Sequence, residues 1–190
     1  PESSAASDVY KRQDIFYNYE YAFYDSHLVS EFEKFKSHYI RFSTKPFDFL
    51  NIQAGLGTGN EIAYREEIPE LGDRFSFNTS IEVTLNNNLR IKPSVNFSRL
   101  KKLDSQEYFF DGYIARFDIR YQFTSSLNLR VISEYNEFSD QFFVQPLISW
   151  RPNSDTIFYL GGNQNYIDEF VDYNSPNYRV NKSQLFLKFQ

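Results

Sequence analysis

The sequence predicts an all-β fold: an antiparallel up-and-down transmembrane β-barrel segment of about ten long strands. Two observations carry this prediction. Polar and apolar residues alternate along segments of about 12 residues, whereas strands of globular proteins are commonly about 5–6 residues long. Short turns also alternate with longer connections, as they do between the two rims of outer-membrane barrels.

The composition excludes several classes of protein. Aromatic residues make up 19% of the 190 residues, with 21 Phe and 15 Tyr, and such side chains favour strands. The mean hydropathy is −0.56, and no apolar run approaches the ~18 residues of a membrane-spanning helix. The absence of Cys excludes disulfides and thiolate metal sites. A net charge of −5 does not indicate the basic surface that a nucleic-acid-binding protein needs.

The clearest alternation surrounds Asn86-Asn87-Asn88 and predicts a hairpin. Before the turn, Phe75, Phe77, Thr79, Ile81, Val83 and Leu85 share one face, and Arg74, Ser76, Asn78, Ser80, Glu82 and Thr84 share the other. After it, Leu89, Ile91, Pro93, Val95 and Phe97 alternate with Arg90, Lys92, Ser94, Asn96 and Ser98. Each arm is long enough to cross the apolar band of a membrane, for which a tilted strand needs about 9–11 residues.

The same period-two pattern predicts the remaining strands, at 15–24, 32–43, 47–57, 113–123, 127–134, 142–150, 156–166 and 178–190. Short turns are predicted near residues 45–46, 86–88, 124–126 and 152–155. Longer connections are predicted at 25–31, 58–73, 102–107 and 167–177, with a brief exception near 139–140. If the short turns are periplasmic, the last strand ends in the periplasm, which is usual for outer-membrane barrels.

The two ends of the sequence predict a fragment. Residues 1–13 are small and polar and resemble translated sequencing-adapter read-through, which recurs in metagenomic reading frames. We treat them as a non-native leader and residues 14–190 as the C-terminal portion of an outer-membrane barrel domain. The chain also lacks a starting Met and stops at Gln190, just after an aromatic residue. Two alternatives remain for the ten strands. Either they are part of a larger barrel, in which case the fragment has unpaired edges, or they close into a barrel by themselves.

Charged side chains occupy the polar face of the predicted strands. If the apolar face meets lipid, the lumen-facing candidates are Arg74, Glu82, Arg90, Lys92, Arg116, Asp118, Arg120, Arg130 and Glu134. Ionisable groups that line a water-filled path in a membrane protein are candidates for function. The competing interpretation is a cross-strand salt-bridge network that only holds the wall together, and the mixed signs favour it.

Other candidate sites are weaker. The predicted loop 61–73 carries five acidic residues that could ligate calcium, but the spacing matches no cation loop and favours a solvated surface loop. His27 and His38 are the only imidazoles, and neither lies in a pattern that predicts a catalytic triad. The sequence therefore predicts no catalytic residue, no metal site and no cofactor.

Glycines and prolines mark local irregularities. Gly55, Gly57 and Gly59 resemble a phosphate loop only superficially, because no helix pattern follows. We interpret them as bulge or turn positions where a strand enters a loop. Pro93 and Pro146 fall inside strands, and each predicts a bulge or an imperfectly paired neighbour because proline cannot donate a ladder hydrogen bond.

Three segments carry a resemblance to a known family: residues 117–124 (FDIRYQFT), 149–161 (SWRPNSDTIFYLG) and 184–189 (QLFLKF). They are similar to the C-terminal region of a family of Bacteroidetes-type bacteria, the domain-of-unknown-function family 5916, and the likeness extends over residues 14–190. The resemblance implies an outer-membrane barrel with no established activity. It also implies an upstream family-nine carbohydrate-binding-like domain, absent from this chain, to which any glycan binding would belong.

The sequence leaves three functions open. The first is an integral barrel of a Gram-negative outer membrane with a channel or uptake role, whose partners are the lipid bilayer and the barrel assembly machinery. The second is a soluble β-barrel or sandwich that binds a small ligand through its aromatic residues. The third is a barrel-embedded hydrolase, for which the fragment offers no catalytic constellation.

Overall fold

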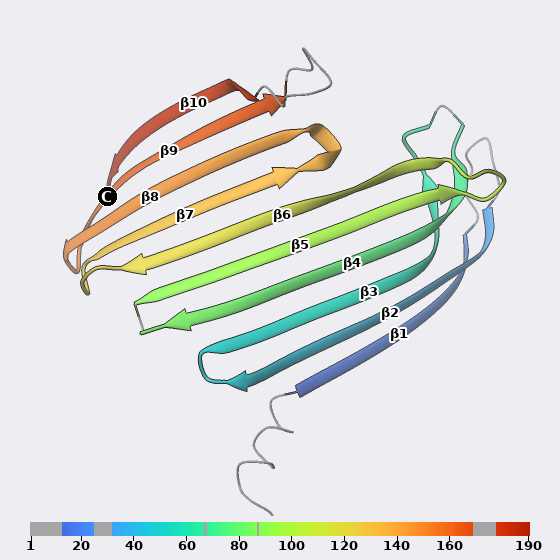
Figure 1. Ribbon diagram of the computed structural model, residues 1–190, viewed down its shortest axis with the longest axis horizontal. Coiled ribbons are helices and arrows are strands. Elements are labelled where there is room, and N and C mark those ends of the chain that lie inside the picture. Colours follow the sequence, from blue (N-terminus) through green and yellow to red (C-terminus); the bar gives the residue numbers. More distant parts are fainter. Residues whose placement is uncertain (1–12, 25–31, 67, 87, 169–177) are drawn as a thin grey trace, which may run out of the picture. The chain divides into compact units, whose positions relative to one another are not determined.

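The structure is a computed structural model that describes residues 13–24, 32–66, 68–86, 88–168 and 178–190. Within these residues the chain forms ten strands joined in sequence order into one antiparallel sheet (Figure 1). This order confirms the predicted all-β, antiparallel, up-and-down class. The outer strands β1 and β10 are not paired with each other in the described residues, so the sheet is not closed into a barrel and closure stays a prediction.

The strands are as long as the alternation predicts. In chain order they are β1 (Gln13–Tyr24), β2 (Phe32–Phe47), β3 (Leu50–Ala63), β4 (Glu70–Leu85), β5 (Leu89–Lys102), β6 (Tyr108–Gln122), β7 (Leu127–Asn136), β8 (Gln141–Asn153), β9 (Thr156–Asp168) and β10 (Tyr178–Phe189). A short 3-10 helix, Glu137–Ser139, joins β7 to β8. No helix in the described part of the chain is long and apolar enough to span a membrane.

Local side-chain hydrogen bonds fix the short turns. Between β6 and β7, the Thr124 hydroxyl oxygen accepts hydrogen bonds from the backbone N–H groups of Ser126 at 3.2 Å and Leu127 at 3.0 Å. Between β8 and β9, the side-chain oxygen of Asn153 accepts from Asp155 N–H at 3.1 Å. Hydroxyl and amide side chains commonly form such turns, since they satisfy backbone donors that leave the ladder.

Two boundaries differ from the prediction. The first short turn lies between Phe47 and Leu50, not at residues 45–46. The register shifts between Thr44 and Phe47, and such an irregularity accommodates Pro46, which cannot donate to a ladder. The predicted loop 58–73 is also shorter, because β3 extends to Ala63 and β4 begins at Glu70.

Pro146 behaves as predicted. The β8–β9 ladder runs from Val144↔Gln164 to Leu147↔Gly161 without a change of register. Between these pairs, Gln145 and Pro146 have no ladder partner in β9. Pro146 still pairs with Val131 of β7. The proline therefore leaves one neighbour imperfectly paired and forms no bulge.

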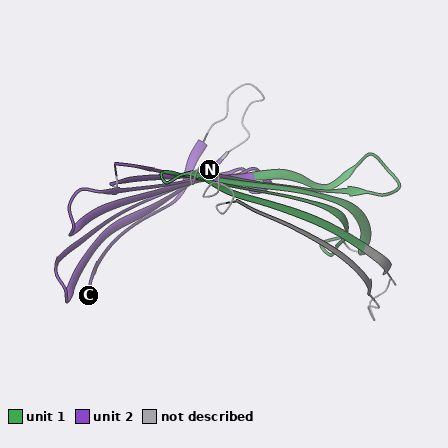
Figure 2. Ribbon diagram, turned by 90° about the horizontal axis from the view of Figure 1, so that it is seen from below, with its two compact units in different colours: residues 1–80, 95–113 green, residues 81–94, 114–190 purple. Residues whose placement is uncertain are grey.

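The chain divides into two compact units (Figure 2). Unit 1 comprises residues 1–80 and 95–113, and unit 2 comprises residues 81–94 and 114–190. Unit 1 contains β1 to β3, and unit 2 contains β7 to β10, whereas β4, β5 and β6 contribute one part to each unit.

Both units have a thin core, because a single-layer sheet has little interior. In unit 1, the buried hydrophobic residues are Ile62, Ala63 and Leu100. Leu100 is close to Gly72, where an added Cβ would lie 2.9 Å from the leucine side chain and 2.7 Å from the Lys101 carbonyl oxygen. In unit 2, Ile132 is the buried hydrophobic residue among those described.

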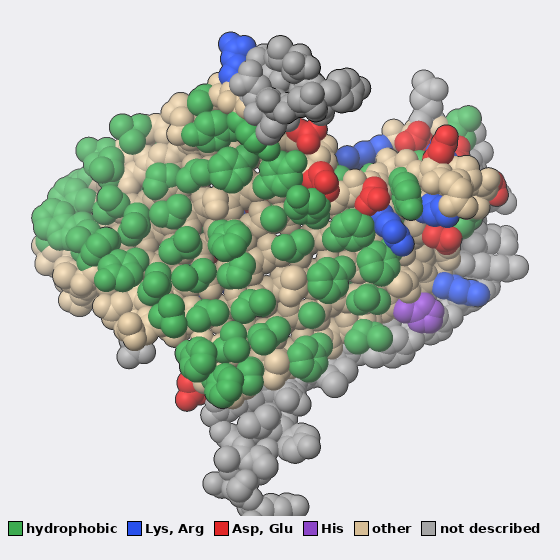
Figure 3. All heavy atoms as spheres, viewed as in Figure 1, with side chains coloured by type: hydrophobic (Ala, Val, Ile, Leu, Met, Phe, Trp, Pro, Cys, Tyr) green, Lys and Arg blue, Asp and Glu red, His purple; other side chains and the backbone are tan. Residues whose placement is uncertain are grey.

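One face of the sheet in unit 2 is apolar and uncovered. The ladder from β7 to β9 aligns its hydrophobic residues, as in the row Leu129, Ile148 and Leu160. On β10, Leu185 is 81% exposed and Leu187 is 76% exposed. Hydrophobic side chains cover the middle of the face seen in Figure 3, and the visible charged side chains gather near the strand ends.

Aromatic side chains border this apolar face at both strand ends. Near the short turns, Trp150 stacks on Phe158 with ring centroids 5.2 Å apart. Near the longer connections, Phe142 lies 6.0 Å from Tyr166. About eight residues separate the two aromatic positions on β8, and the same holds on β9. At about 3.3 Å per residue the two belts are about 26 Å apart along each strand.

Candidate functional site

The polar face of unit 2 collects eight of the nine lumen-facing candidates. Strand alternation and register place on one face Glu82, Arg90, Lys92, Arg116, Asp118, Arg120, Arg130 and Glu134. Arg74 belongs to unit 1, where its Nε lies 3.3 Å from a carboxylate oxygen of Glu61. Whether this face lines a lumen stays a prediction.

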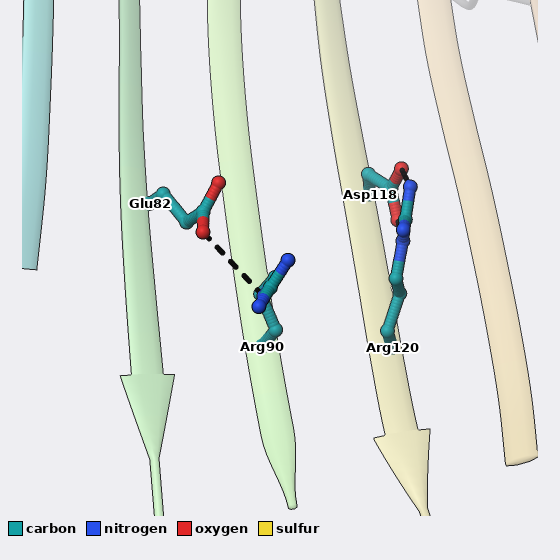
Figure 4. A network of polar contacts seen from close by, with 4 residues as sticks. All are labelled: Glu82, Arg90, Asp118 and Arg120. Carbon is teal, nitrogen blue, oxygen red and sulfur yellow. Dashed lines mark hydrogen bonds and ion pairs between the residues drawn. The ribbon is translucent and has the colours of Figure 1, made fainter. Parts of the chain in front are cut away.

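Ion pairs occupy part of this face. Arg90 Nε of β5 lies 3.4 Å from a carboxylate oxygen of Glu82 on β4 (Figure 4). Arg120 donates two hydrogen bonds of 3.0 Å to the carboxylate of Asp118 on its own strand. These contacts support the salt-bridge interpretation for this part of the sheet.

A third ion pair follows the ladder directly. Arg116 and Glu134 are opposite each other on β6 and β7, and Arg116 Nη1 donates to the Glu134 carboxylate at 3.3 Å. Opposite charges in this position stabilise an antiparallel pair by about 0.2–1 kcal/mol. The next pair on the same face is Asp118 opposite Ile132, and the pair after it is Arg120 opposite Arg130.

Arg120 and Arg130 are directly opposite each other in the β6–β7 ladder. Like charges in this position destabilise a sheet. Asp118 compensates Arg120 by its two hydrogen bonds. Arg130 Nε is buried and has no hydrogen-bond partner in the described structure. The ion pairs therefore account for Arg120, whereas the Nε of Arg130 is left without a hydrogen bond.

Beside this pair lies a hollow of about 480 Å³ at the short-turn end of unit 2. Its lining contains three arginines, Arg90, Arg120 and Arg130, and no acidic residue. The other lining residues are Thr84, Asn88, Leu89, Tyr121, Gln122, Asn128, Leu129, Leu147, Ser149 and Tyr159. The hollow therefore brings three positive charges to one concave surface.

A row of hydrogen-bonding side chains crosses five strands beside the arginines. The ladder pairs Gln122 with Asn128, Asn128 with Ser149 and Ser149 with Tyr159. Lys188 of β10 continues the row opposite Tyr159. Four of the five residues line the hollow, and none of the five carries a negative charge. The short-turn end of the polar face can therefore donate many hydrogen bonds to a bound group.

Cations outnumber carboxylates on the polar face of the strands in unit 2. The carboxylates are Glu82, Asp118 and Glu134, and the cations include Arg90, Lys92, Arg116, Arg120, Arg130, Lys182 and Lys188. The chain as a whole has a net charge of −5. The excess of positive charge is thus a local property of this face.

Two aromatic residues on the polar side lie over glycines of a neighbouring strand. In unit 1, Tyr39 is opposite Gly57, and a Cβ at Gly55 would be 2.5 Å from the Tyr39 hydroxyl oxygen. In unit 2, a Cβ at Gly161 would be 2.5 Å from the Phe186 ring. The glycines therefore give room for a large side chain of the next strand.

This finding corrects the interpretation of the glycine series. Gly55, Gly57 and Gly59 lie inside β3 and not at its junction with a loop. Gly59 has φ 153°, where residues with a Cβ are strained, and its added Cβ would clash with the Lys36 carbonyl oxygen. Close approach of β2 explains these glycines better than a turn does.

The remaining sequence candidates do not gather into a site. His38 lies on β2 opposite Thr58, and His27 lies outside the described residues. Glu61 is in β3, and Glu70 and Asp73 are in β4, so the acidic loop of the prediction is mostly strand. In the described ranges, no three His, Asp or Glu side chains come together as a metal centre would require.

Sequence reasoning missed Ser149 and Tyr159 as neighbours of the arginines. The two faces of β9 are hard to separate by alternation, because Gly161 and Gly162 interrupt it. Register would have supplied the missing signal, since the short turn after Asn153 places Tyr159 opposite Ser149. No protein-family model matches the chain, and no curated protein matches it either.

Proposed function

We propose that this chain forms part of the wall of a transmembrane β-barrel in the outer membrane of a Gram-negative bacterium, with a channel or uptake role. The observation that carries the proposal is the uncovered apolar face of the sheet, with Leu185 and Leu187 more than three-quarters exposed. Soluble monomers rarely expose large contiguous apolar patches. Lipid would cover such a face, whereas water would not.

The two aromatic belts support a membrane environment. Barrels of this kind carry an apolar band about 25 Å tall with aromatic girdles at both interfaces. A separation of about 26 Å along strands tilted by about 35–45° corresponds to about 20 Å along the membrane normal. Rings on both sides of such a band would lie at the level of the lipid headgroups, where their polar atoms meet water.

The connections support an orientation. β2 and β3, β4 and β5, β6 and β7, and β8 and β9 are each joined by at most four residues, which favours a periplasmic rim for these turns. The opposite connections would face the outside. With this orientation, β10 enters from the outside and ends at the periplasmic rim, where assembly machinery reads the last strand.

A closed wall is part of the proposal. Membranes do not tolerate open sheet edges, because unpaired backbone N–H and C=O groups are costly in lipid. We propose that β1 and β10 pair either with each other or with strands of a longer protein. The likeness to family 5916 favours a longer protein, whose upstream domain would contact glycans. We assign no catalytic role to the chain.

Refolding tests this proposal. The purified chain is refolded into a mild detergent and run on a denaturing gel with and without boiling. A closed barrel is expected to migrate faster when the sample is not boiled. It is also expected to insert into lipid vesicles, where its strands are protected from added protease. A soluble monomer with no detergent requirement would contradict the proposal and would favour a soluble sandwich or barrel instead.

A further inference from the structure

We propose that Arg90, Arg120 and Arg130 form a binding site for an oxyanion, a phosphate, sulfate or carboxylate group carried by a small water-soluble solute. The site lies in the hollow of about 480 Å³ on the polar face of unit 2. The inference deepens the proposed function and rests on it, because a closed wall would make this face the lining of an aqueous path.

The arginines provide the recognition chemistry. A guanidinium group is permanently charged, and its planar fork of N–H donors matches the geometry of carboxylate and phosphate. The three guanidiniums line one hollow from three consecutive strands, β5, β6 and β7. Their carboxylate partners Glu82 and Asp118 are not among its lining residues. The side of the arginines that faces the hollow therefore remains available to an anion.

The pairing of Arg120 with Arg130 indicates a role beyond stabilisation. A direct cross-strand pair of like charges destabilises the sheet. Arg130 Nε is also buried without a partner, and an unsatisfied buried donor costs further stability. An oxyanion between the two guanidiniums would remove both penalties, since it neutralises the repulsion and accepts hydrogen bonds.

The neighbouring polar row indicates the size and character of the solute. Gln122, Asn128, Ser149 and Tyr159 supply amide and hydroxyl groups along one side of the hollow. Its volume falls within the range of about 300–1,000 Å³ that is typical for small-molecule sites. We therefore infer a polar solute larger than an inorganic ion, with its charged group at the arginines and its uncharged groups along the row.

The charge balance of the face favours anions over cations. Its cations outnumber its three carboxylates, and each of these carboxylates has an ion-pair partner. Low-dielectric walls strengthen the field of such an unbalanced cluster and raise the local concentration of anions. Lipid headgroups share the same oxyanion chemistry, but they would meet the apolar face and its belts.

The test measures phosphate binding by the full chain refolded in an uncharged detergent. Inorganic phosphate is the probe, and isothermal titration calorimetry at low salt is the measurement. Saturable binding is expected in the native chain. Arg130→Gln is expected to weaken it roughly tenfold, the usual effect of removing one charge-assisted hydrogen bond.

Lys182→Gln is the matched control. It removes one positive charge from the same face, but Lys182 is opposite Asn165 and does not line the hollow. Phosphate binding is expected to stay within about twofold of the native value in this variant. An equal loss in both variants would overturn the proposal, because it would reduce the site to a general charge effect.

Two further results would overturn the proposal. One is a refolded, heat-modifiable chain that binds no phosphate, an outcome that leaves the barrel proposal intact. The other is binding only when phosphatidylglycerol is added to the micelles, which would assign the oxyanion to a lipid headgroup. A chain that fails to refold in detergent contradicts the proposed function itself and is recognised by the gel before any titration.

Discussion

Arg120 and Arg130 are directly opposite each other in the β6–β7 ladder, four residues along each strand from the favourable pair Arg116 and Glu134. The same two strands therefore carry one stabilising and one destabilising charge pair on the same face. Natural proteins retain destabilising groups where function needs them. The stability of the sheet should respond in opposite directions when each pair is broken.

The first prediction concerns this difference. Arg130→Gln removes the repulsion and the unsatisfied Nε, so the free energy of unfolding should rise by about 0.2–1 kcal/mol. Arg116→Gln should lower it by a similar amount, because the 3.3 Å contact with Glu134 is lost. Urea unfolding of the refolded chain, followed by circular dichroism, measures both. A loss of stability in Arg130→Gln would show that Arg130 stabilises the wall.

The second prediction concerns the apolar face, which we propose is covered by lipid. Phe117 lies midway between Tyr113 and Tyr121 on β6 and is 49% exposed. Phe117→Arg would place a charge near the bilayer midplane, which is expected to destabilise a barrel by about 2–4 kcal/mol. The measurement is the fraction of heat-modifiable protein across a urea series in lipid vesicles.

Gln145→Arg is the control for this second prediction. Gln145 lies at a similar depth on β8, but it is opposite Ile132 on the polar face. An arginine there would project into the aqueous side and should change stability by less than about 0.5 kcal/mol. Equal sensitivity at the two positions would contradict the assignment of the two faces.

The third prediction concerns the contact of Phe186 with Gly161. Gly161→Ala would put a Cβ 2.5 Å from the Phe186 ring and 2.9 Å from the Leu147 side chain. Overpacking of this kind costs about 1–3 kcal/mol. In a Phe186→Ala background most of this cost should disappear, which a double-mutant cycle measures. Gly162→Ala is the matched control, because its Cβ would meet the Gln184 carbonyl oxygen at 3.2 Å and a Leu185 side-chain carbon at 3.9 Å, so that the Phe186→Ala background should not change its cost.

Much of the sheet could be predicted from the sequence because period-two alternation is strong where one face is apolar. The strands around Asn86 illustrate this, since both arms were placed within a few residues of β4 and β5. Boundaries were less predictable. Lys45 and Pro46 have turn character, yet a local shift of register keeps both residues in β2.

The candidate site could be predicted only in part. Alternation assigns Arg120 and Arg130 to the polar face, but it does not reveal that they are opposite each other. That relationship depends on the length of the turn at residues 123–126, which sets the register of β6 against β7. The place of Tyr159 beside the arginines depends on the register of β7 against β8 and on that of β8 against β9. An error in either register would prevent its prediction.

The fourth prediction concerns ion selectivity. If the closed wall conducts, its excess of cations on the polar face should make the path anion-selective. A planar bilayer with a potassium chloride gradient should give a reversal potential of the sign set by chloride. The triple variant Arg90→Gln, Arg120→Gln, Arg130→Gln should reduce the preference. A cation-selective native chain would contradict the assignment of this face to the lumen.

The fifth prediction uses Trp150, the single tryptophan of the chain. Trp150 stacks on Phe158 in the belt near the short turns and is 47% exposed. In lipid vesicles its fluorescence should be quenched most strongly by bromine atoms near the headgroup end of the acyl chains, because belt residues lie at the interface. A second variant, Trp150→Phe with Phe117→Trp, moves the reporter to the middle of the apolar face, where deep bromine atoms should quench best. Equal quenching of both proteins by acrylamide in water would mean that lipid covers neither position, and the membrane assignment of this face would be wrong.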